Sequence, residues 1–112
     1  IETVFMEHRL PKGEMRHHGT VVDPSKIKRV PLMTVEGHKD DITGVGQTEA
    51  AQDLCTSLPD TMRAHHLQAG VGHYGVFNGS RFRNEILSKV RTFMRAHQPR
   101  KSILKRVLQR VA

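Results

Sequence analysis

The chain has 112 residues, of which 37% are hydrophobic and 26% charged, and its formal net charge is +7. These values are typical of one globular domain, and no apolar run is long enough to cross a membrane. The single cysteine excludes an internal disulfide. The lack of Trp, of zinc-finger spacing and of an RNP aromatic motif leaves no element that reads nucleic-acid bases. We therefore expect a soluble domain in a reducing compartment, without a specific nucleic-acid partner.

The positive charge is concentrated at the C-terminal end. Residues 81–112 carry ten Lys or Arg and one acid, giving +9, whereas residues 1–80 carry −2. A basic end of this kind attracts phosphates or anionic surfaces, or simply faces water. The chain begins at Ile1 without a charged-then-apolar signal pattern, so we expect a fragment or a trimmed chain.

The first thirty residues predict little regular structure. Residues 2–9 are typical of the end of a helix, which a Pro and a Gly then stop. Residues 11–26 are rich in Pro, Gly and His and predict a surface connection. Within this connection Asp23 precedes Pro24, which favours the start of a turn or a short helix.

The middle of the chain predicts two strands separated by a helix. Residues 30–36 form an apolar run with β-branched side chains, which indicates a strand buried on both faces, as in a parallel sheet. After a polar loop, Thr48 is the predicted N-cap of a helix that continues to about Leu58. Cys55 lies on the apolar face of this helix, where we expect a buried thiol. Residues 63–68 predict the second strand.

A glycine-rich loop and two helices complete the predicted elements. The loop "GVGHYGVFNG", residues 70–79, surrounds His73 with four glycines. The next helix is expected to have its cap within Asn78 to Ser80. The apolar face of that helix comprises Phe82, Ile86, Leu87, Val90, Phe93 and Met94. A last segment, residues 101–111, has apolar residues on one helical face and basic residues on the opposite face, and it predicts a basic amphipathic helix.

Alternating strands and helices predict an α/β fold with parallel strands and flanking helices. Function in such sheets gathers at the carboxyl ends of the strands. Two polar segments lie at such ends, "EGHKDDI" at residues 36–42 and the loop with His73. A carboxylate that contacts an imidazole fixes its tautomer and stabilises its protonated form, as in a nucleophile–His–acid triad. The sequence therefore predicts an acid–base pair at this edge of the sheet.

The chain order also matches the α/β-hydrolase arrangement, in which the nucleophile precedes the acid and the acid precedes the histidine. The chain contains no G-x-S-x-G motif. Cys55 is expected to be buried in a helix, and Ser80 follows the histidine and is expected to cap one. We therefore expect no nucleophile in this chain and an upstream nucleophile in the intact protein.

Two long segments resemble one protein family. "VPLMTVEGHKDDITGVGQTEAAQDLC" and "HHLQAGVGHYGVFNGSRFRNEI" are similar to the C-terminal region of intracellular polyhydroxyalkanoate (polyhydroxybutyrate, PHB) depolymerases. The resemblance covers residues 1–97 and leaves residues 98–112 as a separate basic amphipathic helix. It implies the C-terminal portion of an α/β-hydrolase fold, without the half that carries the nucleophile. It also implies a cytoplasmic, granule-associated enzyme that hydrolyses the ester bonds of stored polyester or of its hydroxyalkanoate oligomers.

The resemblance also implies site residues. The family acid falls in the pair Asp40 and Asp41, and its histidine is His73. Gly37, Asp40 and Ile42 satisfy the pattern G-x-x-D-x-[IV], which favours Asp40, with Asp41 as the alternative acid. The position after Gly37 holds a histidine here, where a carboxylate is common in the family. This difference changes the local charge without removing the acid.

The aromatic and histidine residues near the site allow further expectations. Tyr74 and Phe77 flank His73, and they either line the substrate cleft or pack beneath it. His65 and His66 are adjacent on a predicted strand, so they point to opposite faces and do not readily bind one ion. No Cys/His spacing indicates zinc. We expect no metal site and no cofactor, and the sequence gives no oligomeric state.

Two other functions fit the same features. One is a non-catalytic module that binds a polyester granule or an anionic surface through the basic C-terminal segment. The other is an acyltransferase of the same fold, similar to the polyester synthases, because the triad does not distinguish hydrolysis from acyl transfer. If the depolymerase hypothesis holds, this chain alone is expected to be inactive.

Overall fold

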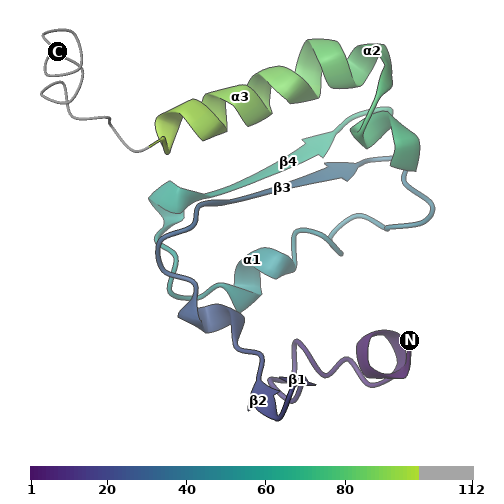
Figure 1. Cartoon of the computed structure of the whole chain (residues 1–112). Coiled ribbons are helices and arrows are strands. Elements are labelled where there is room, and N and C mark those ends of the chain that lie inside the picture. Colours follow the sequence, from purple (N-terminus) through teal and green to yellow (C-terminus); the bar gives the residue numbers. More distant parts are fainter. Residues whose placement is uncertain (99–112) are drawn as a thin grey trace, which may run out of the picture.

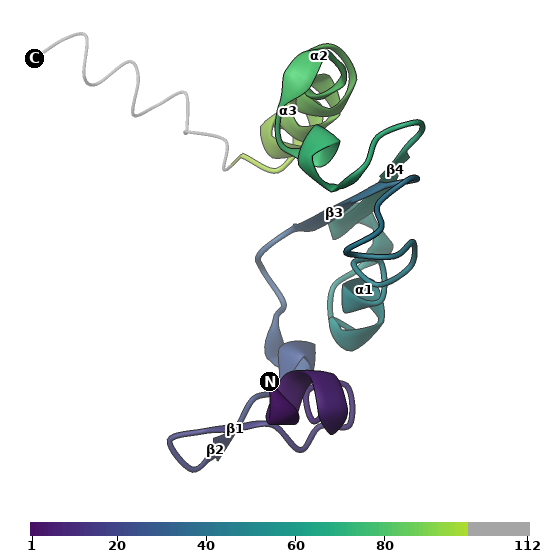
Figure 2. The ribbon, with the colours of Figure 1, turned by 90° about the vertical axis from the view of Figure 1, so that its right-hand side faces the viewer.

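The computed structural model describes residues 1–98, which fold around a two-stranded parallel sheet (Figure 1). The sheet consists of β3 (Leu32–Gly37) and β4 (Arg63–Gln68). Helix α3 (Leu87–Ala96) lies along one face, and the short helix α1 (Ala51–Leu54) lies on the other, as the two views in Figures 1 and 2 agree. The predicted α/β class with parallel strands and flanking helices is therefore confirmed at this coarse level.

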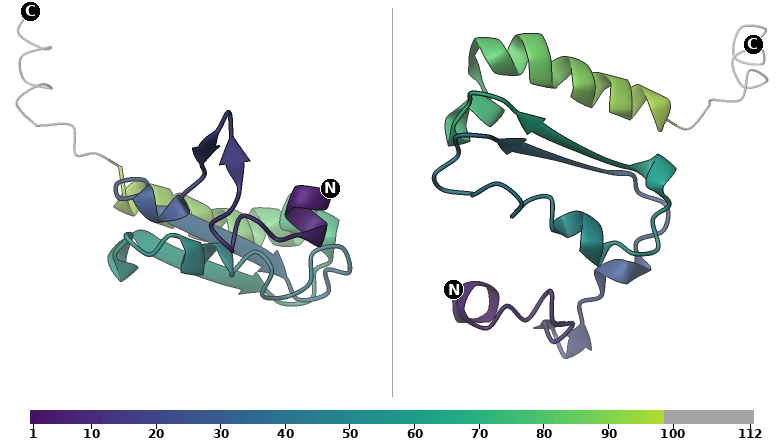
Figure 3. Two further views of the ribbon diagram at one scale, coloured as in Figure 1. Left: turned by 90° about the horizontal axis from the view of Figure 1, so that it is seen from below. Right: turned by 180° about the vertical axis from the view of Figure 1, so that it is seen from behind.

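The segment before the sheet consists of short elements. Its elements are the π-helical turn η1 (Glu2–Met6), the antiparallel strands β1 (Arg16–His17) and β2 (Thr20–Val21), and the 3-10 helix η2 (Pro24–Lys26). The β1–β2 hairpin projects away from the parallel sheet (Figure 3). The side chain of Asp23 accepts a hydrogen bond from the Ser25 N–H at 3.0 Å, so the predicted start of a short helix is confirmed.

The predicted N-terminal helix is shorter than expected. It spans Glu2–Met6 rather than residues 2–9, and the chain leaves helical geometry at His8, where φ is +52°. Its apolar side chains remain in solvent, since Phe5 is 70% and Met6 is 73% exposed. Helices in proteins are stabilised mainly by packing of an apolar face. The short length follows from the lack of such packing in the described residues.

Strand β3 begins two residues later than the apolar run suggests. Val30 is 69% exposed, and Pro31, which lacks an N–H, precedes the strand. The buried positions of the strand are Thr34, Glu36 and Gly37, of which one is an acid. A buried carboxylate therefore lies near the carboxyl end of the sheet.

The predicted helix at residues 48–58 is also different. Regular helix is confined to α1, the N-cap position is Ala50, and no side chain caps it, so the predicted Thr48 cap is wrong. The N–H of Thr48 instead donates to the carboxylate of Glu36 at 2.6 Å. A distant strand residue thus binds the backbone of the turn that precedes α1. Cys55 follows the helix and is only 6% exposed, as expected of a buried thiol.

The C-terminal half follows the predicted order. The 3-10 helix η3 (Asp60–Met62) leads into β4, and the loop after β4 contains the 3-10 helix η4 (His73–Val76). Three helical segments then follow without a break, α2 (Gly79–Arg81), η5 (Phe82–Ile86) and α3.

This continuous helix packs on the sheet through its first half. Ile86 is 1% exposed, whereas Met94 is 57% exposed, so the predicted apolar face holds at Ile86 and fails at Met94. Asn78 occupies the predicted N-cap position, although its side chain makes no capping bond. Among residues 1–98, no helix has the length and apolarity required to traverse a bilayer. The predicted helix at residues 101–111 lies outside the described residues.

Candidate active site

Two loops meet at the carboxyl end of the sheet. We call residues 38–50 the acid loop, which follows β3, and residues 69–79 the histidine loop, which follows β4. Two backbone hydrogen bonds join the start of the acid loop to the end of β4 and to the histidine loop, from His38 N to Gln68 O at 3.0 Å and from Lys39 N to Val71 O at 2.9 Å. These bonds continue the strand pairing past the sheet and hold the two loops side by side.

Two glycines allow this close approach. A Cβ at Gly37 would lie 2.8 Å from the backbone oxygen of Val71 and 3.3 Å from that of Gly72. A Cβ at Gly75 would lie 2.8 Å from Cβ of Val71. Both distances are shorter than real contacts of this kind. Gly37 therefore allows the end of β3 to approach the histidine loop, and Gly75 allows the histidine loop to fold back on Val71.

The two loops bring the predicted acid and base into contact. Oδ2 of Asp40 lies 2.9 Å from Nδ1 of His73. The Asp40 side chain is 5% exposed and that of His73 is 29% exposed, so the imidazole remains accessible. Since Nδ1 faces the carboxylate, Nε2 is the nitrogen left for proton transfer.

The backbone of the acid loop fixes the Asp40 carboxylate. Its other oxygen, Oδ1, accepts hydrogen bonds from the N–H groups of Thr43 at 2.8 Å and Ile42 at 2.9 Å. Burial alone would raise the pKa of this carboxyl. The N–H groups of Thr43 and Ile42, and then the contact with His73, outweigh burial and lower that pKa below its ordinary value. Asp40 is thus held as an anion at neutral pH.

The alternative acid, Asp41, and the aromatic residues Tyr74 and Phe77 are exposed, whereas the side chain of Asp40 is buried. Asp41 is exposed, and its neighbour Asp40 makes the contact with His73. Tyr74 is 75% and Phe77 is 66% exposed, and each ring centroid lies 5.7 Å from that of His73. Both rings therefore stand beside the imidazole in solvent rather than beneath it.

The structure also gives the positions of the two side chains with nucleophile chemistry that the sequence singled out. Cys55 is buried next to the end of α1, and Ser80 lies at the start of α2 and is exposed. The hydrogen bond of His73 within the described residues goes to Asp40. Within the described residues, neither Cys55 nor Ser80 forms a hydrogen bond with His73.

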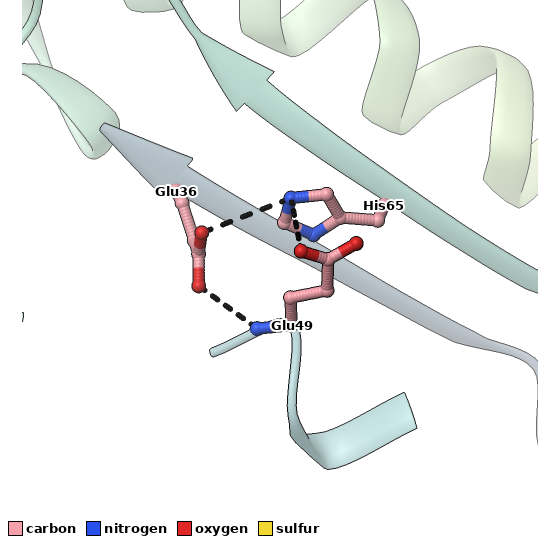
Figure 4. Close-up of side chains that lie close together, drawn as sticks. All are labelled: Glu36, Glu49 and His65. Carbon is pink, nitrogen blue, oxygen red and sulfur yellow. Dashed lines mark hydrogen bonds and ion pairs between the residues drawn. The ribbon is translucent and has the colours of Figure 1, made fainter. Parts of the chain in front are cut away.

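Sequence reasoning missed one residue of this region, Glu36. Its carboxylate is buried in β3 and accepts three backbone hydrogen bonds from the acid loop, of which Figure 4 shows the one from Glu49 N. Glu36, Glu49 and His65 also form a cluster in which one potential ligand atom from each lies within 4.8 Å of the others. The available signal was a single acid at the end of an apolar strand, since a buried charge requires partners.

The same face of the sheet carries a polar network around His65. Nδ1 of His65 lies 2.9 Å from Oγ1 of Thr34, its register partner in β3. Nε2 of Gln52 donates to the same Oγ1 at 3.0 Å. His66, by contrast, bonds to Gln68 on the opposite face, as the alternation of strand side chains predicts.

A carboxylate and an imidazole in contact at the ends of neighbouring parallel strands are typical of the acid–base machinery of α/β enzymes. The model of the family described as "PHB de-polymerase C-terminus" matches residues 1–98, and the chain belongs to this family. It therefore carries a PHB depolymerase C-terminal domain, and the resemblance found in the sequence is confirmed. The family implies hydrolase activity. No curated protein and no solved structure matches the chain.

Proposed function

We propose that this chain supplies the acid and the base of a nucleophile–Asp–His triad that hydrolyses the ester bonds of a polyhydroxybutyrate-type polyester, on an α/β-hydrolase fold. The observation that carries the proposal is the 2.9 Å contact between Oδ2 of Asp40 and Nδ1 of His73. His73 takes the proton of the nucleophile through Nε2 and later activates water. Asp40 orients the ring and stabilises the imidazolium that forms. The nucleophile comes from outside residues 1–98.

The substrate class follows from the surroundings of His73. Tyr74 and Phe77 stand exposed beside the imidazole, and Ile42 and Val45 of the acid loop are 64% and 53% exposed. Exposed apolar side chains around a polar reaction centre suit a polymer with an aliphatic backbone and regularly spaced ester groups. We therefore infer that a polyester granule or hydroxyalkanoate oligomers dock on these side chains.

Substitution of the base tests the triad most simply. His73→Ala in the full-length protein should lower the turnover of a hydroxybutyrate oligomer by at least about 10⁴-fold, because the loss of one triad member disables the unit. His66→Ala, a histidine bonded only within β4, is the matched control and should keep its turnover. Circular dichroism checks that both variants are folded. Turnover of His73→Ala at the control rate would rule out the proposal.

One alternative has an observation of its own. Residues 81–112 carry +9, so a non-catalytic module that binds an anionic or granule surface remains a second candidate. Granule binding that is lost at high salt and on removal of residues 99–112, with no hydrolysis in any context, would favour it. An acyltransferase would instead show transfer to an added alcohol in excess of hydrolysis.

A further inference from the structure

The buried acid in β3 is the polar feature that the proposed triad leaves without a role. The side chain of Glu36 is 1% exposed, and an isolated buried carboxylate is costly. Burial alone would raise the pKa of this carboxyl. The N–H groups of Gly46, Glu49 and Thr48 reverse that effect and lower the pKa below its ordinary value. Glu36 is therefore a buried anion whose charge is balanced mainly by backbone dipoles.

The partners of Glu36 identify what it does. Oε2 accepts from Gly46 N at 2.8 Å, and Oε1 accepts from Thr48 N at 2.6 Å and from Glu49 N at 2.8 Å. Three of about four acceptor positions on the carboxylate are thus occupied by backbone. The remaining direction faces Nε2 of His65 at 3.8 Å (Figure 4). The cluster in Figure 4 is thus a backbone anchor, with its central carboxylate already engaged.

The anchored segment is the acid loop, and two carboxylates share its backbone. Oδ1 of Asp40 accepts the N–H groups of Ile42 and Thr43 at the beginning of the loop. Glu36 accepts those at its end. Both acids also line one small cavity of about 60 Å³, together with His73. The loop is therefore held at both ends by carboxylates. Because Oδ1 of Asp40 is bound to the loop backbone, Oδ2 is directed at Nδ1 of His73.

We propose that Glu36 is a positioning residue for the Asp40–His73 pair, acting through the backbone of the acid loop. This inference rests on the proposed triad. Glu36 touches neither the substrate nor the reacting atoms. Release of its three N–H donors frees the exposed end of the loop, and the turn that holds Asp40 loosens with it. Misplacement of a catalytic group by about 1 Å can cost on the order of 100-fold in rate, whereas substrate contacts remain. The effect should fall on kcat and not on KM.

The test compares Glu36→Gln with Glu49→Gln in the full-length protein. The first change places an amide where Gly46 N–H needs an acceptor. The second removes a half-exposed carboxylate from the same cluster and leaves every backbone donor in place. We expect Glu36→Gln to lower kcat per titrated active site by about 10- to 100-fold, with KM little changed, as outer-shell substitutions do at other sites. Glu49→Gln should match the wild type.

A second readout does not depend on activity. Amide hydrogen exchange at Ile42 and Thr43, whose N–H groups bond to Asp40 and not to Glu36, should become faster in Glu36→Gln. The exchange-protected Nδ1 proton signal of His73 should weaken. A residue that only adds global stability would leave both local signals and the kcat per folded enzyme unchanged. Wild-type exchange and kcat in folded Glu36→Gln would overturn the proposal.

A milder variant covers the case in which Glu36→Gln does not fold. Thr48→Pro removes one donor to Glu36 and leaves the carboxylate in place, in the turn that precedes α1, where proline breaks no helical hydrogen bond. Thr48→Ala is its side-chain control. Thr48→Pro should also lower kcat and speed amide exchange at Ile42 and Thr43, by less than Glu36→Gln does. If Thr48→Pro has the same kcat and exchange rates as Thr48→Ala, the proposal is overturned. If His73→Ala retains turnover, the triad fails, while the exchange readout still decides whether Glu36 positions Asp40.

Discussion

Residues 1–31 and residues 32–98 differ in how their backbone is held. In the first region the hydrogen bonds outside regular elements are local, such as Glu14 N to Arg9 O and Val22 N to Met15 O. In the second region some of them also join distant residues, from His38 N to Gln68 O and from Lys39 N to Val71 O. The family match spans both regions. The comparison teaches that the geometry of the site is determined within residues 32–98, by bonds between two loops and a strand.

The same contrast holds for apolar side chains. Ile1 is 94% and Phe5 is 70% exposed in the first region, whereas Leu58 and Ile86 are 2% and 1% exposed in the second. Burial of apolar area is the main stabilising term in folding. Stability should therefore depend strongly on the second region and weakly on the first.

The largest expected effect concerns this core. Ile86→Ala should destabilise the protein by about 2–5 kcal/mol, because it removes a fully buried side chain and leaves a cavity. Phe5→Ala is the matched change in the first region and should stay within about 0.5 kcal/mol. Denaturant unfolding of both variants measures the difference. An equal loss of unfolding free energy in the two variants would mean that the first region packs as tightly as the second and would contradict the contrast between them.

A smaller effect should follow from pH at the end of α3. Nε2 of His97 lies 2.9 Å from Thr61 O and Nδ1 lies 2.8 Å from Phe93 O. Carbonyl oxygens only accept, so both nitrogens must carry protons, and these two bonds, that to Thr61 first, raise the pKa of His97. The tether between the end of α3 and η3, which precedes β4, is thus strongest when the imidazole is charged.

The sign of this effect is fixed by the raised pKa. The stabilisation is fully present below the ordinary histidine pKa of 6.5 and is lost as pH rises through the higher value of the folded state. The difference in Tm between wild type and His97→Gln should therefore shrink as pH rises above 6.5. His8→Gln, in the first region, should change Tm little at any pH. A Tm difference for His97→Gln that grows with pH would contradict the tether.

Much of the second region could be predicted from sequence. The apolar run at residues 30–36 predicted β3, residues 63–68 predicted β4, and the chain order predicted an acid–base pair at their ends, for which the family resemblance pointed to Asp40 and His73. These features depend on local pattern and chain order, which the sequence displays. The acid loop could not be predicted, because Glu36 lies 10 to 13 residues before its three donors. The sequence does not indicate which backbone N–H groups a distant buried carboxylate will bind.

Other errors have the same physical origin. Thr48 was predicted as an N-cap from local chemistry, but α1 begins three residues later, and the buried acid in β3 binds the Thr48 N–H in the turn before it. Met94 was assigned to the apolar face of its helix, yet that end of α3 is exposed, since the described part of the sheet does not cover it. Long-range partners, which propensity does not encode, decide both positions.

The most direct test of the account compares Asp40→Asn with Asp41→Asn in the full-length protein, with a hydroxybutyrate oligomer as substrate. The two changes remove the same charge from adjacent residues, and Asp40 contacts His73. The account predicts that Asp40→Asn lowers kcat by about 10⁴-fold while the fold is retained, and that Asp41→Asn stays close to wild type. Wild-type turnover in Asp40→Asn, or an equal loss in Asp41→Asn, would contradict it.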